Sequence, residues 1–133
     1  MYTGSCLCGS IQYQIEGELE PVQLCHCRQC RKAQGTPFVS NIPVAASAFR
    51  ITSGEDAMKE YESTPGKIRA FCGRCGSPIL SRRTTMPEVV RIRAGTINED
   101  LPVRPAFHIF AAHKANWWEI QDSLPQYSDF PAQ

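Results

Sequence analysis

The chain has 133 residues, with 14 lysines and arginines against 13 acidic residues, so its formal net charge is +1. This length fits a modest core, and we expect a single domain over residues 1–133. The near balance of charge argues against a nucleic-acid-binding protein that relies on a strongly basic surface. No stretch approaches the roughly 20 consecutive apolar residues of a membrane span, and the start MYTGSCLCGS lacks a secretion signal, so we expect a cytoplasmic location.

Short strands separated by turns are predicted along most of the chain. Ile11, Tyr13 and Ile15 alternate with polar residues, which is the period of a half-buried strand. The polar segment Arg28–Gln34 lacks β-branched residues and predicts a short helical turn. Further strands are expected at 38–44, 49–52, 58–62, 68–72, 78–82, 89–94 and 107–110.

The predicted strand at 89–94 has two chemically different sides. Val90 and Ile92 share one side, and Arg91 and Arg93 share the other. Ten prolines and nine glycines are spread along the chain and disfavour long helices. These patterns predict a mainly β fold.

Seven cysteines occur in three blocks, which are Cys6-x-Cys8, Cys25-x-Cys27-x-x-Cys30 and Cys72-x-x-Cys75. Such spacing favours tetrahedral zinc, because a tight turn directs two sulfurs at one ion. The alternative is a disulfide framework. However, an odd count leaves one cysteine unpaired, a Cys-x-Cys bridge closes a strained ring, and disulfides belong mainly to secreted chains. Metal binding is therefore the preferred interpretation.

The number of cysteines predicts two different metal sites. Four thiolates close a structural zinc site, whereas three leave a position open, as in a catalytic site. The two flanking units are assigned to the closed site, which would tie distant parts of the chain together: Cys6, Cys8, Cys72 and Cys75. The central block is assigned to the open site: Cys25, Cys27 and Cys30. A rival division, in which Cys25 and Cys27 join one flanking unit and Cys30 is left out, remains open from spacing alone.

The ligand set of the open site predicts its chemistry. Three thiolates on a divalent ion leave a net charge of −1, which weakens the ion as a Lewis acid relative to histidine sites, where bound water has a pKa of about 7. Activation of water is therefore disfavoured. A substrate thiol is favoured instead, because zinc binds sulfur as thiolate. A thiolate held beside an electrophilic carbon is positioned to form or break a carbon–sulfur bond.

The segments GSCLCGSIQYQI, CHCRQCRKAQGTPF and FCGRCGSPI, followed by HIF and NWW, resemble the glutathione-dependent formaldehyde-activating (GFA) family, which includes the centromere protein V group. The similarity runs from Gly4 to about Leu124. The resemblance implies a β-tent fold of short antiparallel strands organised around zinc-binding knuckles. It also implies two zinc ions, structural at the outer four cysteines and catalytic at the central three. The activity implied is condensation of formaldehyde with glutathione to S-hydroxymethylglutathione, a carbon–sulfur lyase reaction in reverse.

Polar residues after the central cysteines are candidates for substrate contacts. Arg28, Arg31 and Lys32 could hold the carboxylates of an anionic thiol such as glutathione, although a solvated helical face is the alternative. Gln34 and Thr36 are candidates for the pocket wall, and a simple turn also explains them.

The remaining histidines and tryptophans have simpler interpretations. His26 is expected to point away from the ion, His108 to be a hydrogen-bonded core histidine and His113 to face solvent. Of Trp117 and Trp118, one is expected in the core and the other at the surface or a pocket edge.

The predicted function is that of a zinc-dependent lyase that forms or breaks an adduct between a thiol and formaldehyde or another small aldehyde. The main alternative is a non-enzymatic zinc module that binds protein or nucleic acid. It would require one basic surface made of Arg28, Arg31, Lys32, Arg82, Arg83, Arg91 and Arg93. A zinc hydrolase is disfavoured by the anionic ligand set, and because the nearest acids, Glu16, Glu18 and Glu20, are expected at a strand edge.

Overall fold

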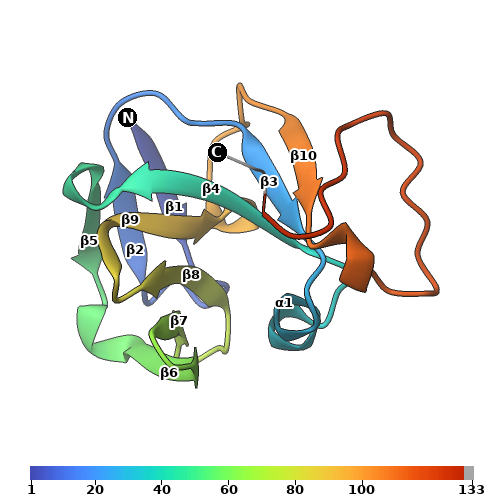
Figure 1. Ribbon diagram of the computed structural model, residues 1–133. Coiled ribbons are helices and arrows are strands. Elements are labelled where there is room, and N and C mark those ends of the chain that lie inside the picture. Colours follow the sequence, from blue (N-terminus) through green and yellow to red (C-terminus); the bar gives the residue numbers. More distant parts are fainter. Residues whose placement is uncertain (131–133) are drawn as a thin grey trace.

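A computed structural model of the protein describes residues 1–130 and is mainly β, as predicted (Figure 1). Its strands are β1 (Tyr2–Ser5), β2 (Gln12–Ile15), β3 (Val22–Cys25), β4 (Val39–Ala45), β5 (Phe49–Ser53), β6 (Met58–Thr64), β7 (Lys67–Cys72), β8 (Pro78–Arg83), β9 (Met86–Arg93) and β10 (Pro105–Ile109). The helical segments are α1 (Arg28–Gln34) and the 3₁₀ turns η1 (Ala46–Ala48), η2 (Glu55–Ala57), η3 (Ala94–Thr96) and η4 (Ala111–His113).

The strands form two sheets. A small sheet has the order β1-β2-β5, and a large sheet has the order β10-β3-β4-β9-β8-β7-β6. Neighbouring named strands of the described chain pair antiparallel, except that β10 runs parallel to β3. A parallel pair needs a long connection, and the rest of the large sheet lies between these two strands in sequence. Figure 1 shows the small sheet at one side of the molecule, with β3, β10 and α1 at the other.

The main core lies where the small sheet packs on one face of the large sheet. Tyr13 and Ile15 of β2 are almost fully buried there, together with Ile42 of β4 and Ile92 of β9. Val90 is also buried in this cluster. The side of β9 that was predicted to be apolar therefore faces the core, which leaves its two arginines on the opposite face of the sheet.

Two strands, β1 and β3, were not predicted from the sequence. Each has only four residues, which is too short for a two-residue period to be clear. β1 has the sequence YTGS, in which a glycine interrupts the strand pattern, and it is held by its pairing with β2. β3 matters for the site because it ends at Cys25 and delivers the central cysteine block to one edge of the large sheet.

No helix within residues 1–130 is long and apolar enough to cross a membrane.

Candidate metal sites and the cavity beside them

The seven cysteines gather into two groups in space. Within each group every sulfur lies within 4.8 Å of the others. The first group contains Cys6, Cys8, Cys72 and Cys75, and the second contains Cys25, Cys27 and Cys30. All seven thiols are free, so the disulfide alternative is not what the structure shows.

The four-cysteine group joins two turns that are distant in sequence. Cys6 and Cys8 lie in the turn between β1 and β2, while Cys72 ends β7 and Cys75 lies in the turn before β8. The Sγ atoms of Cys6 and Cys8 are 3.6 Å apart, and those of Cys8 and Cys72 are 3.9 Å apart. Four sulfurs at about 2.3 Å from a tetrahedral zinc are separated by about 3.8 Å, so this group fits the ion.

Hydrogen-bond donors surround the sulfurs of the four-cysteine group. The backbone N–H of Ile11 donates to Cys6 Sγ at 3.3 Å, and that of Arg74 donates to Cys72 Sγ at 3.4 Å. Hydrogen bonding with Ser77 lowers the pKa of Cys75 to about 5. Donors aimed at sulfur stabilise the thiolate form that zinc requires.

The three-cysteine group is built around the start of α1. Cys25 ends β3, and Cys27 is the N-cap of the helix, where its Sγ accepts a hydrogen bond of 3.3 Å from the backbone N–H of Cys30. The first turn of a helix leaves N–H groups without helical partners, and the sulfur of Cys27 satisfies one of them. α1 ends at Gly35, whose left-handed conformation (φ 69°) suits a glycine.

The three sulfurs of this group also fit a bound cation. Cys30 Sγ lies 3.3 Å from Cys25 Sγ. Hydrogen bonds from Cys25 and then Cys30 hold the pKa of Cys27 well below that of an ordinary thiol, whereas hydrogen bonds with Cys27 and Cys30, together with burial, raise the pKa of Cys25. Thiols this close do not all ionise unless a positive charge lies among them. Three soft sulfur donors suit zinc, with one position left for another ligand.

His26 anchors the central cysteine block without joining the sulfur group. Its side chain is fully buried, and its Nε2 lies 2.8 Å from Nδ1 of His108, whose Nε2 lies 3.0 Å from Asp122 Oδ2. Burial, followed by the charges of His108 and Lys114, lowers the pKa of His26 to about 4, so the ring is neutral near pH 7. His26 and His108 thus take the places expected for them. No pattern in the sequence indicated Asp122.

The outer face of the large sheet next to the three-cysteine group is lined by cations. Side chains of directly paired residues share a face, and Ser81 of β8 is paired with both Arg69 of β7 and Arg91 of β9. On the same face, Lys67 is paired with Arg83. Arg93, paired with Asn41 of β4, is 5% exposed and lies behind them.

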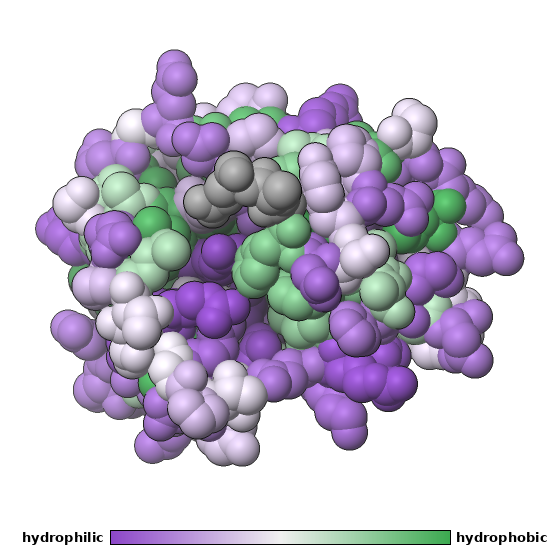
Figure 2. Space-filling view, viewed as in Figure 1, coloured by the Kyte–Doolittle hydropathy of each residue, from purple (hydrophilic) through white to green (hydrophobic). Residues whose placement is uncertain are grey.

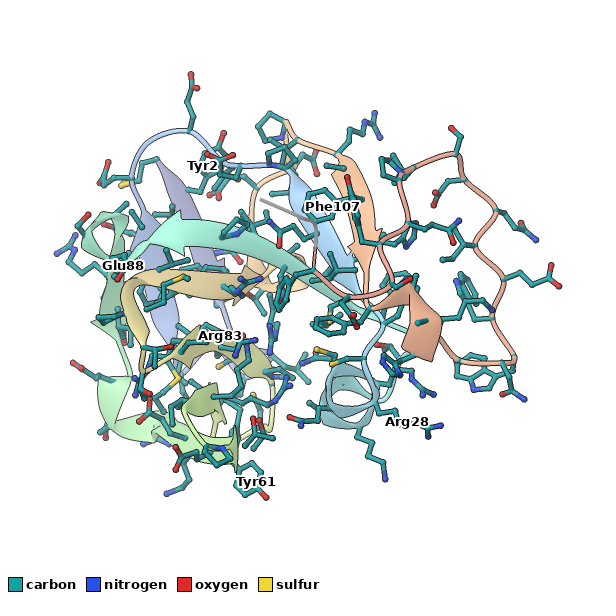
Figure 3. The ribbon with its side chains drawn as sticks, viewed as in Figure 1. Tyr2, Arg28, Tyr61, Arg83, Glu88 and Phe107 are labelled. Carbon is teal, nitrogen blue, oxygen red and sulfur yellow. The ribbon has the colours of Figure 1, made fainter. Side chains whose placement is uncertain are left out.

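These cations and the three cysteines enclose one cavity of about 360 Å³. Its lining includes the three cysteines, Lys67, Arg69, Arg83, Arg91 and Arg28, with Ile109, Phe110 and Phe130 as an apolar wall. Figure 2 shows a hollow near the middle of this face, with strongly hydrophilic residues on one side and hydrophobic residues on the other. In Figure 3, Arg83 extends from β8 on the side that faces α1. A cavity of this size, with few polar groups directed into it, suits a small molecule.

The predicted substrate contacts are divided between two cavities. Arg28 lines the main cavity and also a smaller one of about 220 Å³, which it shares with Arg31, Lys32 and Thr36. Gln34, on α1, lines neither of these cavities. The assignment of these five residues to a substrate therefore stays a prediction, and only Arg28 lies beside the three sulfurs.

The structure adds residues that the sequence analysis did not connect with the central cysteines. Lys67 and Arg69 were not predicted. Arg83 was named only as part of a general basic surface, and Arg91 was named there and on the polar side of the predicted strand at 89–94. The alternation of arginines at 91 and 93 was the available signal. The expectation that one tryptophan lies in the core is wrong, because Trp117 is 66% and Trp118 41% exposed, the latter packing against Phe38.

Fold and site together define a class: a mainly β protein with two clusters of cysteines suited to zinc, one of which opens on a cavity. The sequence model of the family described as "Glutathione-dependent formaldehyde-activating enzyme" matches residues 1–113. The chain belongs to this GFA family.

Two relatives agree with this assignment, and a solved structure shares the fold. The chain is 31% identical over 127 residues, covering 89% of this chain and 80% of the relative, to a Halomonas elongata protein whose provisional name is glutathione-dependent formaldehyde-activating enzyme. It is 28% identical to an uncharacterised lyase of Schizosaccharomyces pombe, covering 59% of this chain and 55% of that protein. Family and names support an enzyme of the lyase type. A Rhodobacter sphaeroides crystal structure shares the fold, with a TM-score of 0.64, 20% identity and coverage of 78% and 99% of the two chains.

Proposed function

We propose that this chain, as one domain, is a zinc-dependent carbon–sulfur lyase of the GFA type, which forms or breaks an adduct between a thiol and formaldehyde or another small aldehyde. The observation that carries the proposal is the difference between the two sulfur groups. Four sulfurs complete one site, whereas the other offers three sulfurs at the wall of a cationic cavity. Zinc held by Cys25, Cys27 and Cys30 would supply a fourth, sulfur-binding position for the substrate thiolate.

Arginines beside the three sulfurs support the entry of another negative charge. Arg69 directs its Nη2 and Nη1 at Cys30 Sγ, at 3.9 and 4.0 Å. Arg93 lies near enough for the charges of Cys30 and Cys25 to favour its charged form, although burial outweighs this and lowers its pKa to about 10. These guanidinium groups offset the charge of the thiolates, so a further thiolate meets attraction where an isolated three-thiolate site would repel it.

Lys67, which lines the same cavity, would supply and recover the proton of the reaction. Burial, followed by the charges of Arg83, Arg91, Arg69 and Arg93, lowers its pKa to about 8, so it exchanges a proton readily near neutral pH. The substrate sulfur attacks the aldehyde carbon, the carbonyl electron pair moves to oxygen, and that oxygen takes a proton from the Lys67 ammonium. The proton released when the thiol ionises restores the ammonium, and the reverse sequence breaks the adduct.

The rival functions receive less support. Arg82, which the nucleic-acid alternative needs on the same surface, points to the core-side face of β8 and bonds to Glu60 at 2.8 Å, whereas Arg83 and Arg91 line the cavity. A hydrolase would need an acidic or neutral-histidine base beside the ion. The cavity lining within residues 1–130 contains no acidic residue. His26 is bonded to His108, and the histidine of the lining, His113, packs against Phe110.

The test is adduct formation on zinc-loaded protein. Exchange spectroscopy by NMR measures how fast isotope-labelled formaldehyde and glutathione exchange with their adduct, and a protein-free sample gives the uncatalysed rate. We expect the wild-type protein to accelerate the exchange and Cys30→Ser to lose the acceleration while keeping its circular dichroism spectrum. Exchange at the uncatalysed rate with wild-type protein that holds two zinc ions contradicts the proposal for this thiol, and the thiols described below then extend the test.

A further inference from the structure

Resting on this proposed function, we infer that the thiol substrate carries about two negative charges besides its thiolate, as two carboxylates or one phosphate monoester, and no ammonium group, so that it is more negative than glutathione. The inference concerns only the cavity beside Cys25, Cys27 and Cys30. Its basis is the density of positive charge on the outer face of β7, β8 and β9, together with the absence of acidic residues from the lining within residues 1–130.

The cations of this face come from neighbouring strands and are held close together by the sheet. Lys67 lies directly opposite Arg83 in the β7–β8 pair. Like charges in that relation destabilise a sheet, so an arrangement of this kind is costly unless an anion lies between them. Arg69 and Arg91 are each paired with the same residue, Ser81, which places a further pair of guanidinium groups on either side of one small side chain.

Apart from the sulfur of Cys30, which Arg69 approaches, the hydrogen-bond partners of these cations are neutral. Arg69 donates to Ser63 Oγ at 3.1 Å, and Arg91 donates to Gln23 Oε1 at 3.3 Å. Buried Arg93 donates to Asn41 Oδ1 and to Ser81 Oγ, and its Nε has no partner. Such a group is expensive to bury without a counter-charge.

On the other face of the same strands, an arginine is neutralised by a carboxylate. Arg82, one residue before Arg83, pairs with the carboxylate of Glu60 at 2.8 Å. Within residues 1–130 no carboxylate lies within 4.0 Å of the charged nitrogens of Lys67, Arg69, Arg83 or Arg91. The sequence has 13 acidic residues, so the lack of acids on this face is not a lack of acids in the chain.

The balance of charges in the cavity then indicates how much negative charge the ligand should carry. The three thiolates and a divalent ion carry −1 together, and the thiolate of a substrate adds −1 more. The face supplies five cations, namely Lys67, Arg69, Arg83, Arg91 and Arg93, so positive charge remains after both are counted. Two further negative charges on the substrate reduce this excess of positive charge, and an ammonium group would restore part of the excess.

The apolar wall holds the cations in place for such a ligand. The ring of Phe130 lies 5.7 Å from the guanidinium carbon of Arg83 and 5.6 Å from that of Arg91. These cation–π contacts orient both side chains while leaving their N–H groups free to donate to carboxylate or phosphate oxygens. Glutathione has two carboxylates, but its ammonium would find no acidic partner in this lining.

The test uses two S-methyl thioethers that differ by one group. S-methylglutathione keeps the ammonium, and S-methyl deaminoglutathione (methylated glutaryl-cysteinyl-glycine) replaces it with hydrogen. Neither sulfur can ionise or react, so calorimetric binding to zinc-loaded protein measures the cavity itself. We expect the deamino compound to bind at least tenfold more tightly, and Arg83→Gln to reduce the difference. Arg82→Gln, on the opposite face, is the matched control and should leave the difference in affinity between the two compounds unchanged.

The outcomes separate this inference from the proposed function. Equal or tighter binding of S-methylglutathione overturns the inference, and the proposed function still stands if free glutathione forms its adduct. Preferential binding of the deamino compound with no adduct from any thiol supports the charge preference and overturns the lyase proposal. If Arg83→Gln fails to fold, Lys67→Gln takes its place with the same expectation.

A second pair of thiols identifies the anionic group. Mercaptosuccinate offers two carboxylates and phosphopantetheine a phosphate monoester, and neither carries an ammonium. Faster adduct formation by either thiol than by glutathione, with a loss of at least tenfold in kcat/KM in Arg83→Gln but not in Arg82→Gln, supports the inference and names the group. Slower reaction of both thiols than glutathione contradicts it.

Discussion

The two cysteine groups of this protein share a chemistry but differ in their surroundings. The four-cysteine group lies between two turns and is surrounded by backbone N–H groups and serine hydroxyls. The three-cysteine group lies at the end of β3 and the start of α1, beside arginines and a cavity. Neutral donors stabilise thiolates that never change partners, whereas fixed cations suit a site where negative charge arrives and leaves. Under the proposed function, this difference separates a site that would hold the fold from a site that would react.

The largest effect is expected when one cysteine ligand is removed from each group, which tests whether the two groups have different roles. Structural zinc supplies roughly 10–16 kcal/mol, as much as the net stability of a domain, so we expect Cys72→Ser to abolish cooperative unfolding. Cys30→Ser should fold and hold one zinc fewer. Circular dichroism and metal counting by mass spectrometry measure both effects. If the two variants lose one zinc each and unfold alike, the division of roles is wrong.

A second test removes the cation that touches a sulfur. Arg69 donates to Cys30 Sγ, and charge-assisted hydrogen bonds contribute about 1.5–3 kcal/mol, which corresponds to a change of roughly 10- to 100-fold. We expect Arg69→Gln to raise KM for the thiol by roughly 10- to 100-fold, while the protein still binds two zinc ions. Arg82→Gln provides the comparison, because its partner Glu60 lies on the other face. A KM that stays at the wild-type value in Arg69→Gln would mean that the guanidinium does not act on the substrate.

The histidine pair tests how the central cysteines are held. His108→Phe leaves Nε2 of His26 without its partner, and a buried unsatisfied group costs about 1–3 kcal/mol. We expect lower thermal stability and faster loss of zinc to a chelator from the three-cysteine site, with the four-cysteine site unaffected. Equal rates of zinc loss from both sites would show that the pair does not support one site in particular.

The smallest expected effect is a pH dependence that originates in the cavity. Lys67 has a pKa lowered to about 8, mainly by burial and then by Arg83, Arg91, Arg69 and Arg93, so it loses its charge as pH rises through that value. Affinity for an anionic thioether should therefore fall severalfold between pH 7 and pH 9. The measurement uses the His113→Asn background, because His113 lines the same cavity.

Lys67→Arg provides the control for this pH dependence. An arginine introduced at this position stays protonated over this range, so the fall should disappear. An unchanged fall in Lys67→Arg would assign the titration to another group.

The sequence was most informative where structure is local. Cys25, Cys27 and Cys30 lie within six residues, so their spacing was enough to predict that they meet, and the polar segment Arg28–Gln34 was correctly predicted as a short helix. The alternation of Val90 and Ile92 with two arginines was also correct, because a strand has a fixed period.

The sequence was least informative where position depends on pairing between distant strands. Lys67 and Arg69 reach the cavity only because β7 pairs with β8 and β8 with β9 in one particular register. A shift by one residue would direct them to the other face. Asp122 lies in a segment outside the named strands and helices, so no pattern marked it as the partner of His108.

The most direct test of the account is the position of zinc in crystals of the metal-loaded protein, located by anomalous scattering with and without an anionic thiol. The account predicts one ion among Cys6, Cys8, Cys72 and Cys75 and a second among Cys25, Cys27 and Cys30, with the sulfur of the thiol beside the second ion only. A single ion, or a thiol that approaches neither the second ion nor the cations of the cavity, would contradict it.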